Sequence, residues 1–143
     1  MESKSKIKSV ACLLRLIPTR ELENFAPLMS GVGIKTDENK LRESQIPITP
    51  GSLEVDVNQG ELNNTFDVKC KFLVDSSDEA TCSQLLAMRN IPVIAIYKDA
   101  NSHEKVIGSP SYPLNIKCSI ASSVMNCELQ GMTDTYNSVI FLQ

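Results

Sequence analysis

The stretch FDVKCKFLV at residues 66–74 decides the fold, because apolar residues alternate with polar ones along it. Such alternation places every second side chain on one face, which is typical of a β-strand with one buried side. The shorter run LEVDV at residues 53–57 has the same pattern, and the turn-forming residues 58–64 lie between the two runs. The two runs therefore predict an antiparallel β-hairpin.

A helix is predicted after this hairpin, over about residues 77–90. Ser76 and Glu79 match a capping box, in which each side chain satisfies a backbone amide at the start of a helix. Pro92 prevents the helix from continuing. The predicted helix carries an apolar stripe at helical spacing, formed by Cys82, Leu85 and Leu86.

The remaining strands are predicted from the second half of the chain. The continuous apolar run VIAIY at residues 93–97 is typical of a central strand that is covered on both faces. A short return strand follows at residues 106–107. Alternating runs at residues 114–120 and 125–129 predict a second hairpin, and residues 136–142 predict a closing strand.

These elements predict a mainly β fold: an antiparallel β-sandwich or barrel over residues 50–143, with one flanking α-helix. A length of 143 residues with 42% hydrophobic residues suits one ordinary domain. Residues 1–49 are predicted to add an N-terminal strand over residues 10–17 and an extended arm or loop.

Prolines and glycines interrupt the arm, which covers residues 18–52, so that it has room only for short helices near residues 20–25 and 37–43. The arm is nevertheless rich in apolar side chains, which favour a surface over solvent. They are the candidate subunit-interface residues, namely Leu22, Phe25, Leu28, Met29, Val32 and Ile34. One interpretation is an arm that packs on a neighbouring subunit, and the other is a loop folded back on its own domain.

Residues suited to catalysis are few. His103 is the only histidine and falls in a predicted hairpin turn, where a solvated side chain is expected. Glu54 and Asp56 point to one face of their strand, as carboxylate pairs can, but a solvated outer face is the usual explanation. We expect no enzyme activity, no metal and no cofactor, since the chain lacks a glycine-rich phosphate loop and C-x-x-C spacing. The cysteines are expected to be reduced thiols, mostly in the core: Cys12, Cys70, Cys82, Cys118 and Cys127.

Charge is unevenly distributed along the chain. The net charge is −3, which disfavours non-specific nucleic-acid binding by the whole surface. Residues 1–20 carry five basic residues against Glu2, and a solvated terminus or a contact with an acidic partner would explain this. No apolar run approaches the roughly 18 residues of a membrane-spanning helix, so no membrane partner is expected.

The order of elements resembles the β-sandwich or barrel with one flanking helix of tail-tube, tail-terminator and neck proteins of tailed bacteriophages. Several stretches are similar to those of small virion proteins from phages and prophages of Bacteroidetes-type hosts. The similarity covers residues 50–143 and is carried by FDVKCKF at 66–72, LLAMR at 85–89 leading into VIAIY, VIGS at 106–109 with Pro113-Leu114, and CELQGM at 127–132.

This resemblance implies a structural protein of the virion that is made in the host cytoplasm. Its partners would be copies of itself in a ring and neighbouring virion proteins, with DNA passing through the lumen without sequence-specific contact. A ring requires two complementary surfaces on each chain, and the arm and exposed strand edges are expected to provide them. The alternative is a monomeric β-sandwich binding module or cell-surface domain without catalysis.

Overall fold

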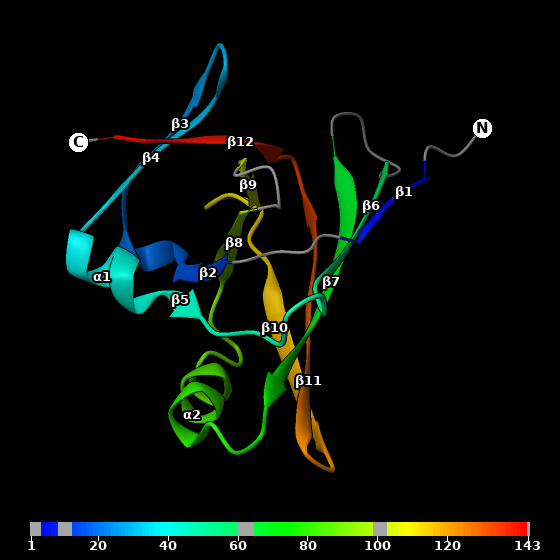
Figure 1. Cartoon of the computed structure of the whole chain (residues 1–143). Helices are drawn as coiled ribbons and strands as arrows, with labels where there is room; N and C mark the ends of the chain where they lie inside the picture. Colours follow the sequence, from blue (N-terminus) through cyan, green and yellow to red (C-terminus); the bar gives the residue numbers. More distant parts are fainter. Residues whose placement is uncertain (1–3, 9–12, 60–64, 99–102, 143) are drawn as a thin grey trace.

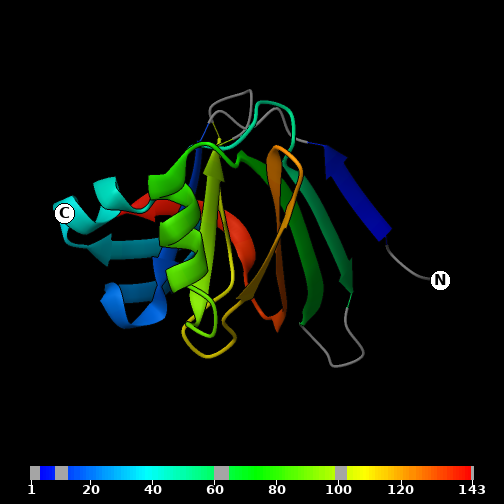
Figure 2. The ribbon, with the colours of Figure 1, turned by 90° about the horizontal axis from the view of Figure 1, so that it is seen from below.

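The computed structural model describes residues 4–8, 13–59, 65–98 and 103–142. Within these residues the strands form two sheets that pack against each other as layers of a sandwich (Figure 1). Figure 2 shows the two layers from below, with helix α2 (Glu79–Ala87) at the end nearest the viewer. The mainly β fold with few helices, predicted from the alternating runs, is therefore confirmed.

The first sheet, called sheet A, is antiparallel throughout and has five strands among the described residues. Both predicted hairpins lie in it, joined through the long strands β7 and β11. The register pairs Val57 with Val68 in the first hairpin and Cys118 with Cys127 in the second. In spatial order the strands are β1 (Lys4–Lys8), β6 (Glu54–Gln59), β7 (Phe66–Asp75), β11 (Val124–Thr133) and β10 (Asn115–Ala121).

The second sheet, called sheet B, has seven strands among the described residues. Its strands pair antiparallel except for β4 and β12, which run parallel. Their spatial order is β3 (Leu22–Leu28), β4 (Gly31–Thr36), β12 (Tyr136–Phe141), β9 (Glu104–Ile107), β8 (Val93–Lys98), β2 (Leu13–Pro18) and β5 (Gln45–Ile46). A 3₁₀ turn over Thr19–Glu21 links β2 to β3, and helix α1 (Glu38–Glu43) follows β4.

Strand β8 lies between two hydrophobic cores, as the continuous apolar run predicted. Its residues Val93, Ala95 and Tyr97 belong to the large core between the sheets, which also receives Leu85 of α2. The alternate residues Ile94 and Ile96 belong to a second core on the opposite face of sheet B. These five residues are all buried, because both faces of β8 are covered, and only the final residue of the strand, Lys98, is half-buried.

The predicted helix is shorter than expected and its cap is a different residue. The N-cap is Asp78, whose carboxylate accepts hydrogen bonds from the backbone N–H of Thr81 at 3.1 Å and from its hydroxyl at 2.7 Å. Ser76 instead lies in the preceding turn, where its N–H donates to the carbonyl of Ser123. The capping-box prediction is therefore wrong, because a tertiary contact holds Ser76 outside the helix. Asn90 follows the helix with φ 68, a conformation that asparagine tolerates.

The arm departs most from the sequence prediction. Residues 22–36 form the β3–β4 hairpin, where a loop with a short helix near residues 20–25 was expected. Pro27 is accommodated because β3 is an edge strand, the position in a sheet where proline is tolerated. The helix expected near residues 37–43 is confirmed as α1, with Asp37 as its N-cap. The turn residues 60–64 and 99–102, and Cys12, lie outside the described residues.

Candidate functional site

The β3–β4 hairpin projects beyond the body of the sandwich, at the top of Figure 1. Its tip carries Leu28, 42% exposed, and Met29, 108% exposed. The Met29 side chain is fully in water and the Leu28 side chain is only partly covered, and apolar area left in water does not stabilise the fold. Leu28 and Met29 are therefore exposed, whereas other apolar residues on the same two strands are buried.

The six candidate interface residues fall on different sides of this hairpin. Val32 and Ile34 are buried, and Leu22 and Phe25 pack partly buried against the same second core. In this fold Val32 and Ile34 are covered by their own domain, because alternation along β4 turns them toward Ile94 and Ile96. Only Leu28 and Met29 of the six are exposed, and the interface prediction now concerns these two residues.

The outward face of the hairpin is also apolar. Gly33 lies on the opposite face of β4 from Val32 and Ile34 and is buried beneath neighbouring side chains; its register partners on the neighbouring strands are Ala26 and Ile140. A Cβ added at Gly33 would meet Leu28 Cδ1 at 3.0 Å and Leu142 Cδ1 at 3.2 Å, so both leucine side chains lie over this glycine. We call this surface the hairpin patch; it comprises Ala26, Leu28, Met29, Gly33, Ile140 and Leu142.

Sequence reasoning missed four of the six residues of the hairpin patch. The alternation of Gly33 with buried Val32 and Ile34 is a signal for an outward apolar face on β4. Ile140 and Leu142 carry no comparable signal, because the parallel pairing of β12 with β4 brings together segments more than 100 residues apart in the sequence. Ala26 was hidden because Pro27 beside it argued against a strand.

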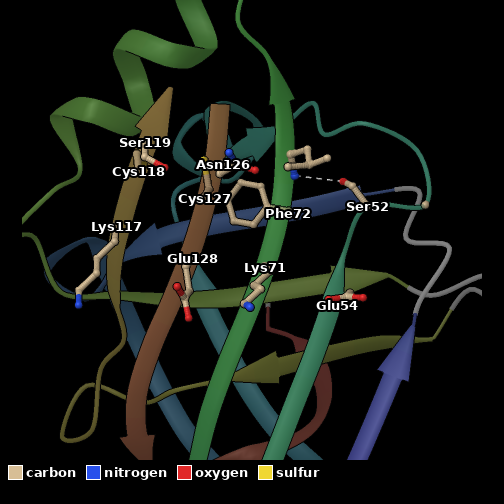
Figure 3. Close-up of a pocket in the computed structure, with 12 residues that line it drawn as sticks. Ser52, Glu54, Lys71, Phe72, Lys117, Cys118, Ser119, Asn126, Cys127 and Glu128 are labelled. Carbon is tan, nitrogen blue, oxygen red and sulfur yellow. Dashed lines mark hydrogen bonds between the residues drawn. The ribbon is translucent and has the colours of Figure 1, made fainter. Parts of the chain in front are cut away.

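A second candidate surface is the outward face of sheet A, which carries a row of alternating charge. Glu54, Lys71, Glu128 and Lys117 are consecutive register partners on β6, β7, β11 and β10. Figure 3 shows these four side chains in a line across the strands, bordering an open hollow of about 620 Å³. Opposite charges thus face each other across every strand pair in the row.

The carboxylate of Glu128 is the electrostatic centre of this row. The Gln130 amide donates a hydrogen bond to Glu128 Oε1 at 2.9 Å, and Lys69 Nζ lies 3.6 Å from the same oxygen. That hydrogen bond is the main reason why the pKa of the Glu128 carboxyl lies below its ordinary value. The positive charges of Lys69 and Lys71 lower this pKa further. A carboxyl group held ionised is a poor general acid at neutral pH, and the pairing of each charge with an opposite one is typical of a solvated face.

Two part-buried polar contacts link strands of sheet B: one joins β2 to β9 across β8, and the other joins β8 to β12 across β9. Arg15 Nη1 donates to Glu104 Oε1 at 2.8 Å, and Arg15 Cζ lies 5.6 Å from the centre of the Phe141 ring. The hydroxyls of Tyr97 and Tyr136 lie 2.9 Å apart and share a hydrogen bond. The two hydroxyls and the Arg15–Glu104 pair thus partner each other, as polar groups inside a fold usually do, whereas Arg15 Nε is buried without a hydrogen-bond partner among the described residues.

The remaining candidates from the sequence have structural explanations. His103 is exposed just ahead of β9. Asp75 accepts hydrogen bonds from the backbone N–H and the hydroxyl of Ser77, and Asp78 caps α2. Across the described ranges, histidine, cysteine and acidic side chains nowhere gather in threes with the geometry for a metal ion. None of the helices described is long and apolar enough to cross a membrane.

Comparisons with known proteins add no relative. No protein-family model matches the chain, and no curated protein and no solved structure matches it.

Proposed function

We propose that this protein is a non-catalytic structural subunit that assembles with copies of itself through the hairpin patch. The observation that carries the proposal is the projecting β3–β4 hairpin with an apolar outward face, including Leu28 and Met29. An apolar surface of this kind, held on a defined strand pair, is characteristic of a protein–protein contact. The other face of the same hairpin is anchored in the second core by Val32 and Ile34, so the patch is presented on a rigid element.

A ring or tube requires a second, different surface to receive the hairpin of the neighbouring subunit. The outer edge of β10 offers one, because β10 is the last strand of sheet A among the described residues and Ile120 on it is 62% exposed. Edge strands with unpaired backbone groups accept additional strands. The proposed contact is therefore head to tail, from the hairpin patch of one copy to the β10 edge of the next.

The assembly that we propose is a tail, neck or tail-terminator ring of a tailed-phage virion, following the resemblance of residues 50–143 to such proteins. The subunit would be made in the host cytoplasm and then incorporated into the virion. DNA would pass through the lumen without sequence-specific contact, and the net charge of −3 is compatible with a surface that does not retain it.

The test is the mass of the protein in solution, measured by sedimentation over a range of concentrations and by electron microscopy of stained particles. We expect closed oligomers or tubes for the natural chain. Replacing Leu28 and Met29 with Ser together should raise the concentration needed for assembly about tenfold or more, because truncating central apolar contacts weakens association most. Circular dichroism should show an unchanged sandwich, since both side chains are exposed.

Met132→Ser is the matched control, because Met132 is 43% exposed but lies on sheet A, away from the hairpin. It should leave assembly unchanged. A natural chain that stays monomeric at every concentration, also when mixed with tail and neck proteins encoded beside it, would overturn the proposal. The monomeric β-sandwich binding module or cell-surface domain would then be the better explanation.

A further inference from the structure

Cys118 and Cys127 form a thiol pair that the proposed function does not use. They are register partners on the neighbouring antiparallel strands β10 and β11. Directly opposite residues of an antiparallel pair have Cα atoms about 4.5 or 5.5 Å apart. Both separations lie inside the range of about 4.4–6.8 Å that a disulfide spans, so the backbone needs no large movement to join the two sulfurs.

Opposite residues also point to the same face of a sheet, which here is the inner face toward α2. Cys127 is buried in the large core, and Cys118 packs against that core while remaining partly exposed. The pair therefore combines one thiol that small reagents can reach with one that is protected from solvent. Such an arrangement suits an attacking thiol and a resolving thiol.

The surroundings favour Cys118 as the thiol that reacts first. The hydrogen bond with the Cys127 thiol lowers the pKa of Cys118, the Arg89 charge lowers it further, and burial acts in the opposite direction. The same hydrogen bond and burial raise the pKa of Cys127. The thiolate is the nucleophilic form of cysteine, so the two thiols have different reactivity.

We propose that Cys118 and Cys127 are a peroxide-oxidisable dithiol that closes to a cross-strand disulfide within the β10–β11 hairpin. The Cys118 thiolate attacks one oxygen of hydrogen peroxide, breaking the O–O bond and forming a sulfenic acid, while the other oxygen leaves as water after protonation. The Cys127 sulfur then attacks the Cys118 sulfur, forming the S–S bond and releasing the sulfenic oxygen as a second water. Two thiols and one peroxide thus give one disulfide and two waters.

The other described cysteines differ from this pair. Cys70 on β7 is buried opposite Val55 and Leu129, and burial raises the pKa of its thiol to about 12. Cys82 on α2 is buried and its thiol donates to the backbone carbonyl of Asp75 at 3.7 Å. Cys70 has no cysteine as its register partner, and Cys82 is buried on a helix, so each should react more slowly with peroxide.

The experiment treats the reduced full-length protein with hydrogen peroxide, blocks the remaining thiols by alkylation, and analyses the peptides by mass spectrometry. Trypsin releases residues 118–143 as one peptide that contains both cysteines. We expect the mass of this peptide to fall by that of two hydrogen atoms, and its two cysteines to become resistant to alkylation. Both changes should occur earlier in the peroxide treatment than any reaction of Cys70 or Cys82. Cleavage at Met125 with cyanogen bromide should leave the two halves joined until a reductant separates them.

Variants identify the role of each sulfur. Cys127→Ala should trap Cys118 as a sulfenic acid that dimedone labels, whereas Cys118→Ala should slow the oxidation of Cys127 about tenfold or more. Cys70→Ser is the control and should leave disulfide formation unchanged. The proposal is overturned if peptide mapping of the natural chain joins Cys82 to Cys127, or if Cys118 and Cys127 remain alkylatable while other thiols oxidise.

Discussion

Ile34→Ala tests whether the β3–β4 hairpin is an integral part of the domain. Ile34 has 0% exposure and packs with Ile17, Ile94 and Val106 in the second core. The substitution removes three carbon atoms, worth about 0.8 kcal/mol each in transfer from water, and leaves a cavity that adds to the loss. We therefore expect the free energy of unfolding to fall by about 3–4 kcal/mol.

That loss is large for a domain whose total stability is about 5–15 kcal/mol. It corresponds to a decrease in melting temperature of about 10 °C for a chain of this size. The assay is urea denaturation followed by far-ultraviolet circular dichroism, because the chain has no tryptophan for fluorescence. A single transition with an unchanged slope is expected, since the hairpin shares its core with β8.

Leu28→Ala on the same hairpin is the control. Leu28 is 42% exposed, so its truncation should lower the stability of the monomer by less than about 1 kcal/mol. An Ile34→Ala protein that loses less than about 1 kcal/mol, or that unfolds in two separate steps, would refute the reasoning. The hairpin would then be an appendage that adds little to the stability of the sandwich.

Two further predictions concern the interior of sheet B and the charged face of sheet A. Ile94→Asp should unfold the domain, because it places an unpaired carboxylate at a fully buried position. Unfolding would be seen as loss of the β-sheet circular dichroism signal. The control Ile120→Asp should stay folded, because Ile120 is 62% exposed. The pKa of Glu128 lies below its ordinary value of 4.5, so its ionised form stabilises the fold above that pH, and the contribution is lost as the pH falls through the lowered value. Glu128→Gln should therefore make the urea midpoint fall less steeply as the pH is lowered. Part of the decline should remain, because hydrogen bonds from Ser77 also lower the pKa of Asp75, which therefore contributes to the same pH dependence. An equally steep decline in Glu128→Gln would contradict this explanation.

The local patterns that could be predicted from the sequence are those in which one strand or helix carries its own signal. Alternation along residues 66–74 identified β7, and the unbroken apolar run identified β8 as a strand buried on both faces. The prolines of the arm gave a misleading signal, because Pro27 is harmless on an edge strand and no local pattern shows that β3 lies at an edge. The prediction that Ser76 caps the helix was wrong for a similar reason. The N–H of Ser76 donates a hydrogen bond to the carbonyl of Ser123, which is distant in the sequence.

Among the candidate site residues, Leu28 and Met29 could be found from the sequence because they are large, apolar and beside a turn. Their neighbours Ile140 and Leu142 could not be found, because β12 pairs in parallel with β4 across most of the chain length. The thiol pair required the register of the β10–β11 hairpin, which the sequence predicted only approximately.

The periodicity of apolar residues by itself determined that this protein is mainly β, because burial on one face imposes a period of two on any strand. It also determined which residues of β7 and β8 are buried. The tertiary structure decided which strands become neighbours and therefore which face of the hairpin is covered. Val32 and Ile34 became core residues, and Leu28 and Ile140 became surface residues, because pairing between distant segments and the closure of the second core are properties of the whole chain.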